Sequence, residues 1–267
     1  MADAATDSLL VADDGHVRTI TLNRPDVFNA FDDALTMDMQ KALKDAARDA
    51  NVRVLILTGN GRAFSSGQDL GDLKDRYVPG YVPEYRKDLL KRYNPIIEQL
   101  AGMDKPVIAA VNGVAAGAGC SLALACDMRI ASEHASFIEA FVNVGLIPDS
   151  GSTWFLPRLV GMARAFELCC TGRKVGAEEA ERIGLVNRVV PADDLLTVAT
   201  TEATRLASLP PRAIALTKRL LLQGATRPLG DQLDAEGWAQ DTAGRTADHM
   251  EGMTAFLEKR APEFTGA

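Results

Sequence analysis

The sequence has few of the residues that carry metal, redox or nucleic-acid chemistry. Its three histidines have no ligand spacing and its four cysteines form no C-x-x-C pair, so no metal site is expected. The cysteines are interpreted as small core residues in a reducing compartment, and they are Cys120, Cys126, Cys169 and Cys170. Acidic side chains outnumber basic ones by 36 to 29, whereas nucleic-acid-binding proteins normally present a basic face.

Long apolar runs are also missing. No segment approaches the length of about 20 residues that a membrane helix needs. Met1 to Leu10 is polar and acidic, unlike a signal peptide. The sequence therefore predicts a cytoplasmic protein that binds neither membranes nor nucleic acid. What is present is 47% hydrophobic and 24% charged residues, the composition of an ordinary globular protein of 267 residues.

Strand and helix patterns alternate through most of the chain. Short apolar or alternating runs predict strands at 17–22, 52–58, 106–112, 128–131 and 186–190. Amphipathic spacing predicts helices at 34–50 (capped by Asp32 or Asp33), at 84–103 with an interruption at Asn94-Pro95, and at 152–160, 161–171 and 176–183. Residues 71–83 predict a mobile loop, and only helices are expected after 190, at 192–208, 210–223 and 229–258. This pattern indicates an α/β core over 1–195 with a helical region over 196–267.

A glycine- and alanine-rich loop at 113–121 follows one of the buried strands. Gly113, Gly117 and Gly119 leave backbone N–H groups uncovered where a helix begins. Such N–H groups can bind phosphate or a developing oxyanion. Small residues can equally serve only to let a helix pack close to a strand, and the loop alone does not decide between the two. Residues 64–69 form a second turn of this type.

Asp149 is the carboxylate with the most unusual setting, in Leu146-Ile147-Pro148-Asp149-Ser150-Gly151. Apolar and small surroundings disfavour its charged form and raise its pKa, which suits a general acid or base. However, Pro-Asp-Ser-Gly is also a good β-turn, and aspartate is a preferred helix N-cap. Glu139, between Phe137 and Phe141, is a second carboxylate with either a buried or a strand-end explanation.

Two other site types fit poorly. The chain has no G-x-S-x-G, and Ser150 has a glycine on one side only, which excludes the usual serine hydrolase turn. Gly117-x-Gly119 lacks the third glycine of a dinucleotide site, where Leu122 stands, and it is in the middle of the chain.

With these segments together, the sequence resembles the enoyl-CoA hydratase/isomerase (crotonase) superfamily over nearly its whole length. The resemblance lies in six segments, which are 22–30, 64–69, 105–119, 145–149, 177–186 and 251–260. It implies a spiral of ββα units, a C-terminal helical region that forms homotrimers or hexamers, and an acyl-CoA thioester as substrate, with no separate cofactor because CoA is part of the substrate.

The resemblance also implies roles for individual residues. The thioester oxygen would accept hydrogen bonds from the backbone N–H groups of Ser66 and Ala118. CoA would lie near Asp26, Val27 and Phe28, with Lys259 from a neighbouring region or subunit. Asp26 stands where many relatives have a basic residue. The remaining substrate-binding positions that the resemblance implies are Gly67, Gln68, Asp69, Gly117 and Phe141.

The two glutamates with which hydratases activate water would fall at Ser121 and Phe141, neither of which can take a proton from water. Asp149 matches the single catalytic carboxylate of Δ3,Δ2-enoyl-CoA isomerases and of the phenylacetate-pathway isomerases that convert ring-1,2-epoxyphenylacetyl-CoA, which also share Arg92 to Pro95. The sequence therefore predicts an acyl-CoA isomerase, and Phe137, Phe141 and Trp154 are expected to form a dry wall for an unsaturated or aromatic acyl group. The alternatives are a hydratase that uses Glu139 and a catalytically silent acyl-CoA-binding subunit.

Overall fold

The structure is a computed structural model that describes residues 8–71, 74 and 78–267. The predicted mobile loop at 71–83 falls partly on residues 72–73 and 75–77, which lie outside the described residues. The strands are β1 (Leu9–Asp14), β2 (Val17–Leu22), β3 (Val54–Gly59), β4 (Ala63–Ser65), β5 (Val107–Val111), β6 (Val114–Ala116), β7 (Met128–Ser132), β8 (Ser136–Ile138), β9 (Val175–Gly176) and β10 (Arg188–Val190).

The helices fall between and after these strands. They are α1 (Asp33–Arg48), α2 (Tyr85–Lys91), α3 (Asn94–Gly102), α4 (Ala118–Leu124), α5 (Ser152–Val160), α6 (Met162–Thr171), α7 (Ala177–Arg182), α8 (Leu195–Ala207), α9 (Pro211–Gly224), α10 (Leu229–Gly244) and α11 (Ala247–Glu258). Short 3₁₀ helices are η1 (Pro25–Val27), η3 (Ala140–Val144) and η4 (Ala192–Asp194). None of the helices in the described residues is long and apolar enough to cross a bilayer.

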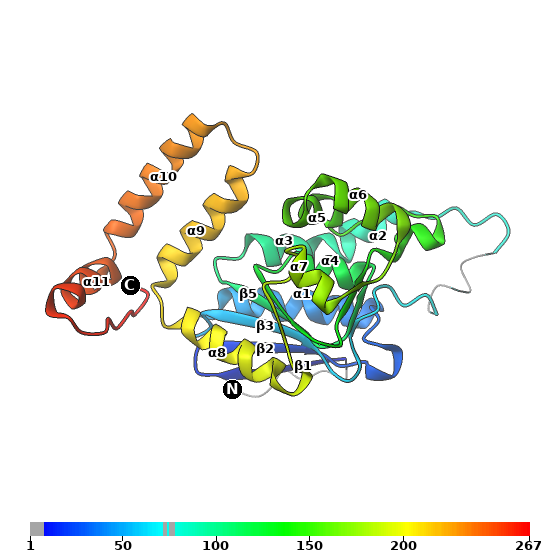
Figure 1. Ribbon diagram of the computed structural model, residues 1–267, viewed down its shortest axis with the longest axis horizontal. Helices are drawn as coiled ribbons and strands as arrows, with labels where there is room; N and C mark the ends of the chain where they lie inside the picture. Colours follow the sequence, from blue (N-terminus) through cyan, green and yellow to red (C-terminus); the bar gives the residue numbers. More distant parts are fainter. Residues whose placement is uncertain (1–7, 72–73, 75–77) are drawn as a thin grey trace.

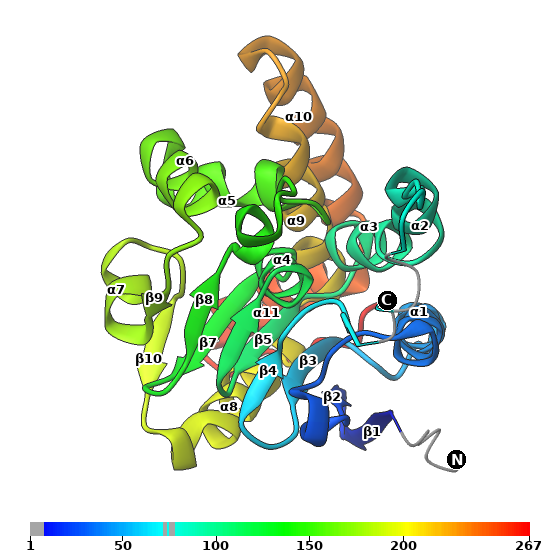
Figure 2. The ribbon, with the colours of Figure 1, turned by 90° about the vertical axis from the view of Figure 1, so that its right-hand side faces the viewer.

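Two sheets form the core (Figure 2). The larger has the order β1-β2-β3-β5-β7-β10 and is parallel except for the β1–β2 hairpin. The smaller has the order β4-β6-β8-β9. The chain repeats a pattern in which one strand joins the large sheet, the next strand joins the small sheet, and a helix follows. The strand pairs are β3-β4, β5-β6 and β7-β8. The predicted α/β class and its ββα spiral are therefore confirmed.

Alternation along the large sheet sorts its apolar side chains onto two faces. Leu55, Leu57 and Val107 belong to the main core, beneath α1, α3 and α4. Ile56, Ile108 and Ala110 pack with α8 on the opposite face. Both faces are covered, which is the usual situation of a parallel sheet and explains its nearly continuous apolar strands.

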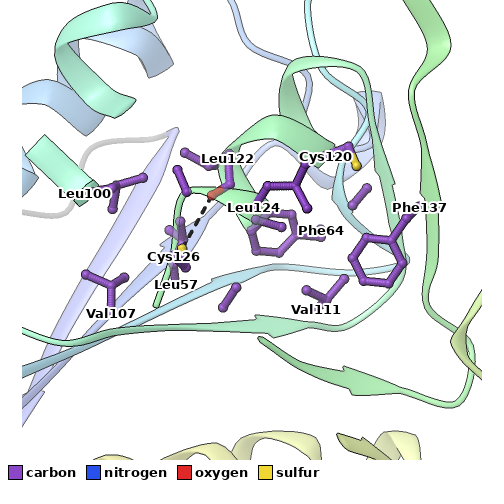
Figure 3. Packing of buried hydrophobic residues seen from close by; sticks show 14 of the residues in the cluster. Leu57, Phe64, Leu100, Val107, Val111, Cys120, Leu122, Leu124, Cys126 and Phe137 are labelled. Atoms are coloured by element: carbon purple, nitrogen blue, oxygen red, sulfur yellow. Dashed lines mark hydrogen bonds between the residues drawn. The ribbon is translucent and has the colours of Figure 1, made fainter. Parts of the chain in front are cut away.

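The cysteine prediction holds for two of the four residues. Cys120 and Cys126 are buried among Leu57, Phe64 and Leu100 in the main core (Figure 3). Cys169 and Cys170 lie in the last turn of α6, where Cys169 is half-buried against the core and Cys170 is exposed. The interpretation of all four as core residues is corrected to this extent.

The C-terminal helical region is confirmed, with one change. α9, α10 and α11 extend away from the sheets as an arm, whereas α8 lies on the large sheet (Figure 1). The single helix predicted over 229–258 is two helices that meet at Arg245-Thr246. Thr246 caps α11 by accepting a hydrogen bond from His249 N, 3.1 Å away.

Candidate active site

Two small-residue loops meet at one end of the small sheet, after β4 and after β6. Residues Phe31 and Gln68 form a parallel bridge beside this point. A Cβ atom built on Gly67, whose φ is +88°, would lie 2.7 Å from Ala116 O and 3.1 Å from Ala118 N. Only glycine lets the two loops approach this closely.

A cavity of about 170 Å³ opens over these loops. Its walls come from the 66–68 and 117–118 loops, from α2 and the residue after it, and from the segment around η3. The lining residues are Ser66, Gln68, Leu70, Tyr85, Asp88, Leu89, Arg92, Tyr93, Gly117, Ala118, Ala140, Phe141, Val144, Leu146 and Asp149. The structure therefore brings Asp149 together with both predicted N–H loops.

The free N–H groups of the first loop differ from the sequence prediction. Ser66 N donates to Phe28 O at 2.9 Å, so its N–H is already engaged by the protein. Gln68 N and Ala118 N have no hydrogen-bond acceptor among the described residues, and both residues line the cavity. Ala118 is the first residue of α4, where N–H groups lack helical partners. The pair with free donors is thus Gln68 and Ala118 rather than Ser66 and Ala118.

Asp149 lies in a turn with two successive left-handed residues, Ser150 at φ +50° and Gly151 at φ +87°. Its Oδ1 accepts a hydrogen bond from Ser150 Oγ at 2.8 Å. The N-cap of α5 is Gly151, and no side chain caps that helix. Asp149 therefore does not serve as a helix cap. Burial raises the pKa of the Asp149 carboxyl above its ordinary value, and the Ser150 hydrogen bond partly opposes this shift.

Glu139 and Ser121 lie behind the cavity wall. Glu139 is 3% exposed and Ser121 is 0% exposed, and neither lines the cavity. Ser152 Oγ donates to Glu139 Oε1 at 2.8 Å. Burial raises the pKa of Glu139 to about 7. A water held in the cavity would contact neither side chain directly.

The predicted aromatic wall is correct for one of its three members. Phe141 lines the cavity, but Phe137 points into the main core (Figure 3). Trp154 lies in a separate apolar groove against α9, with the Arg158 guanidinium 3.9 Å from its ring centroid. β8 and α5 turn these two rings away from the cavity.

Two tyrosines that the sequence analysis did not assign a role complete the aromatic lining. Tyr85 and Tyr93 flank the cavity from α2 and from the residue before α3. The Tyr93 hydroxyl donates to Gln68 Oε1, and burial raises the pKa of Tyr93. The Arg92 to Pro95 segment was the one feature of the sequence that could have drawn attention to the two tyrosines.

The other predicted binding residues lie outside the cavity. Val27 and Phe28 are about two-fifths exposed beside the 66–68 loop, where Ser66 Oγ donates to Val27 O. Asp69 forms an ion pair with Arg24, 3.1 Å from Nη1 to Oδ2, and so stabilises the loop. Lys259 follows α11 on the arm and is exposed. No group of three or more potential metal ligands is found among the described residues.

Comparisons with known proteins show the family to which this fold and sequence belong. The family model described as enoyl-CoA hydratase/isomerase matches residues 13–267. The chain is 45% identical over 250 residues to a 1,2-epoxyphenylacetyl-CoA isomerase of Escherichia coli, which covers 94% of this chain and 95% of that protein. It is 36% identical over 258 residues to a 2,3-dehydroadipyl-CoA hydratase of the same organism, with 97% and 98% covered. The crystal structure of an enoyl-CoA hydratase from Bacillus anthracis matches with a TM-score of 0.91 and 38% identity, covering 97% of this chain and 100% of that one.

Proposed function

The chain belongs to the enoyl-CoA hydratase/isomerase family, and we propose that within this family it is an isomerase of unsaturated or aromatic acyl-CoA thioesters. It would move a double bond or open a ring epoxide. One observation carries the proposal. A half-buried carboxylate that caps no helix, Asp149, shares the cavity with two free N–H donors, Gln68 and Ala118.

The proposed chemistry uses these three groups alone. The Asp149 carboxylate removes a proton from the carbon between the thioester and a 3,4 double bond. The electron pair passes into the carbonyl, and the dienolate oxygen accepts hydrogen bonds from Gln68 N–H and Ala118 N–H. The neutral Asp149 then returns the proton two carbons further along, which yields the conjugated 2-enoyl thioester. A raised pKa suits a group that must both take and return a proton.

Hydration needs a second acid–base group beside the substrate, and the positions expected for it do not supply one. Ser121 is buried behind the wall, and Phe141 places a ring in the cavity. Glu139, the alternative acid, is also behind the wall. Asp88 is the other carboxylate in the cavity lining, and it belongs to α2. The relative with 45% identity is named an isomerase, and others are named hydratases.

A spectroscopic assay for the conjugated thioester tests the proposal. Absorbance should rise when a 3-enoyl-CoA is added and should stay constant with a 2-enoyl-CoA. A fall in absorbance with the 2-enoyl-CoA would instead show hydration. Tight binding of both thioesters without any change would show a catalytically silent subunit.

Matched variants test the assignment of Asp149. Asp149→Asn should lower kcat by roughly 1,000-fold or more, because the amide cannot take the proton. Asp88→Asn should stay within about three-fold of the parent protein, since Asp88 is given no part in proton transfer. Near-normal activity of Asp149→Asn, or a comparable loss in Asp88→Asn, would contradict the assignment.

A further inference from the structure

Glu139 is a buried carboxyl that the proposed reaction does not use. It stands just before η3, and its Oε2 atom is buried without a hydrogen-bond partner. Three titratable side chains lie near it, namely Cys120 of α4, Asp149 of the site turn and Cys169 of α6. A buried carboxyl oxygen without a partner is costly and calls for a reason.

A chain of two hydroxyl groups connects Glu139 to the site. Ser152 Oγ lies 2.8 Å from Glu139 Oε1 and 2.8 Å from Ser121 Oγ. Ser121 Oγ in turn lies 3.1 Å from Asp149 O and 3.2 Å from Gly117 O. These two carbonyl groups belong to the residue that carries the base and to the residue before the Ala118 donor. The chain therefore ends on the backbone of both catalytic loops.

The protonation state of Glu139 decides which acceptor the Ser121 hydroxyl can donate to. When Glu139 is ionised, Ser152 donates to it and Ser121 donates to Ser152. The two backbone carbonyls then receive nothing from Ser121. When Glu139 is neutral, its proton goes to Ser152, the Ser152 proton goes to Ser121, and Ser121 is free to donate to Asp149 O or Gly117 O.

We propose that Glu139 is a positioning residue of the acyl-CoA site, and that in its neutral form it acts through Ser152 and Ser121 to hold the Gly117–Ala118 loop and the Asp149 turn together. Its kinetic consequence rests on the proposed isomerase function. Burial, reinforced by the nearby Asp149 and opposed by contacts from Ser152 and the Cys120 thiol, raises the pKa of Glu139 to about 7. The hold is therefore present below neutral pH and is lost as pH rises through that value.

The kinetic test follows kcat for a 3-enoyl-CoA from about pH 6 to about pH 8.5 in the parent protein and in Glu139→Gln. Loss of one hydrogen bond predicts an about five- to ten-fold fall in kcat of the parent protein over this range. A glutamine side chain cannot ionise and its amide still donates to Ser152, so Glu139→Gln should keep the acidic kcat throughout. Ser152→Ala removes the hydroxyl that competes for the Ser121 proton, so Ser121 should donate to the backbone carbonyls at every pH and the alkaline fall should disappear. An unchanged alkaline fall in Glu139→Gln, or none in the parent protein, overturns the proposal.

A binding measurement separates this proposal from the proposed function. Acetoacetyl-CoA enolises in solution, so its affinity reports on the oxyanion donors without any isomerisation. Its Kd should rise about five-fold more with pH for the parent protein than for Glu139→Gln, the effect of one hydrogen bond. If this difference is found but no 3-enoyl-CoA is isomerised, the function fails and the positioning role stands. If isomerisation is found but the two proteins share one pH profile, the positioning role fails and the function stands.

Discussion

Gly67 shows how much the candidate site depends on a single missing side chain. Gly67→Ala would place a methyl group 3.1 Å from Ala118 N, over one of the two free donors, and 2.7 Å from Ala116 O. We expect kcat to fall by at least roughly 100-fold, the usual effect of losing one oxyanion donor. Gly80→Ala is the matched control, because Gly80 has a similar φ of +89° with no atom within 4 Å of the added Cβ. Equal losses in both variants would show that backbone strain, not the covered donor, is responsible.

The sequence predicted the residues of the site better than their exact roles. Asp149 was singled out through the family resemblance, because the local Pro-Asp-Ser-Gly turn by itself left a structural explanation open, and the structure places it in the cavity lining. The identity of the free N–H could not be predicted, since Ser66 N is engaged by Phe28, far away in the sequence. Side-chain direction was equally inaccessible. Phe137 and Phe141 are four residues apart, and the passage from β8 to η3 sends one ring into the core and the other into the cavity.

At the scale of single helices and strands, a buried ion pair joins α9 of the helical arm to the core. Lys218 of α9 reaches Asp127 Oδ2 at 2.7 Å and also donates to Leu100 O at 2.8 Å. Lys218→Met leaves Asp127 without its cation. We expect a loss of roughly 3 kcal/mol in the free energy of unfolding at neutral pH, measured with urea. Lys87→Met, at the exposed Lys87–Glu84 pair, should cost less than about 1 kcal/mol.

The pH dependence of the Lys218→Met deficit follows from the sign of the Asp127 shift. Burial raises the pKa of Asp127 and the Lys218 charge opposes this rise. Without Lys218 the folded-state pKa moves further above the unfolded-state value. Such a group is neutral and harmless at low pH, and it destabilises the fold as pH rises through the folded-state pKa. The deficit should therefore shrink on going from about pH 7 to about pH 4. A deficit that is constant with pH would point to lost packing instead.

The joint between α10 and α11 tests a helix boundary that periodicity alone missed. An apolar pattern continues across 229–258, but Gly244 ends one helix and Thr246 caps the next. Thr246→Ala should cost about 1 kcal/mol of unfolding free energy, because His249 N–H loses its acceptor. Thr254→Ala, inside α11, should change stability by less than about 0.5 kcal/mol. Equal effects of the two variants would argue against a cap at 246.

The order of the helices and strands was predicted from the sequence more accurately than their boundaries. Buried strands such as β3 and β5 are continuous apolar runs and were found at nearly their observed bounds. β1 was missed because its exposed residues Asp13 and Asp14 belong to a strand that pairs with one neighbour only. α4 begins at Ala118 rather than after 121, since a helix can start inside a glycine-rich loop when the loop packs tightly. The division of the chain at 195/196 stays a prediction.

At the scale of the whole molecule, the arm exposes more apolar surface than a solitary chain would be expected to keep. Its exposed side chains include Leu229, Leu233, Trp238, Phe256 and Leu257. Large apolar side chains left exposed in such number are typical of a region that contacts another protein. Homotrimers or hexamers remain the predicted state, with the arm as the contact region.

Lys259 is the residue predicted to connect assembly with substrate binding. The resemblance implies that it contacts CoA, yet α11 lies far across the molecule from α2, whose residues line the cavity (Figure 1). We therefore predict that a neighbouring copy supplies this contact. Lys259→Glu should raise KM for a CoA thioester about ten-fold, the loss of one charged hydrogen bond, and leave kcat and the sedimentation coefficient unchanged. Lys44→Glu, an exposed lysine of α1, is the control and should change neither.

Phe256→Glu distinguishes the effect of losing the assembly from the effect of losing the Lys259 charge. A carboxylate on this exposed face of α11 should dissociate the assembly, because an unpaired charge is costly to bury at an interface. If Lys259 acts between subunits, the dissociated Phe256→Glu protein should show the same rise in KM as Lys259→Glu, although its own Lys259 is intact. Sedimentation velocity and steady-state kinetics on one preparation decide the matter. A dissociated protein with an unaltered KM would mean that each chain binds CoA with its own residues, and Lys259 would lose its predicted role.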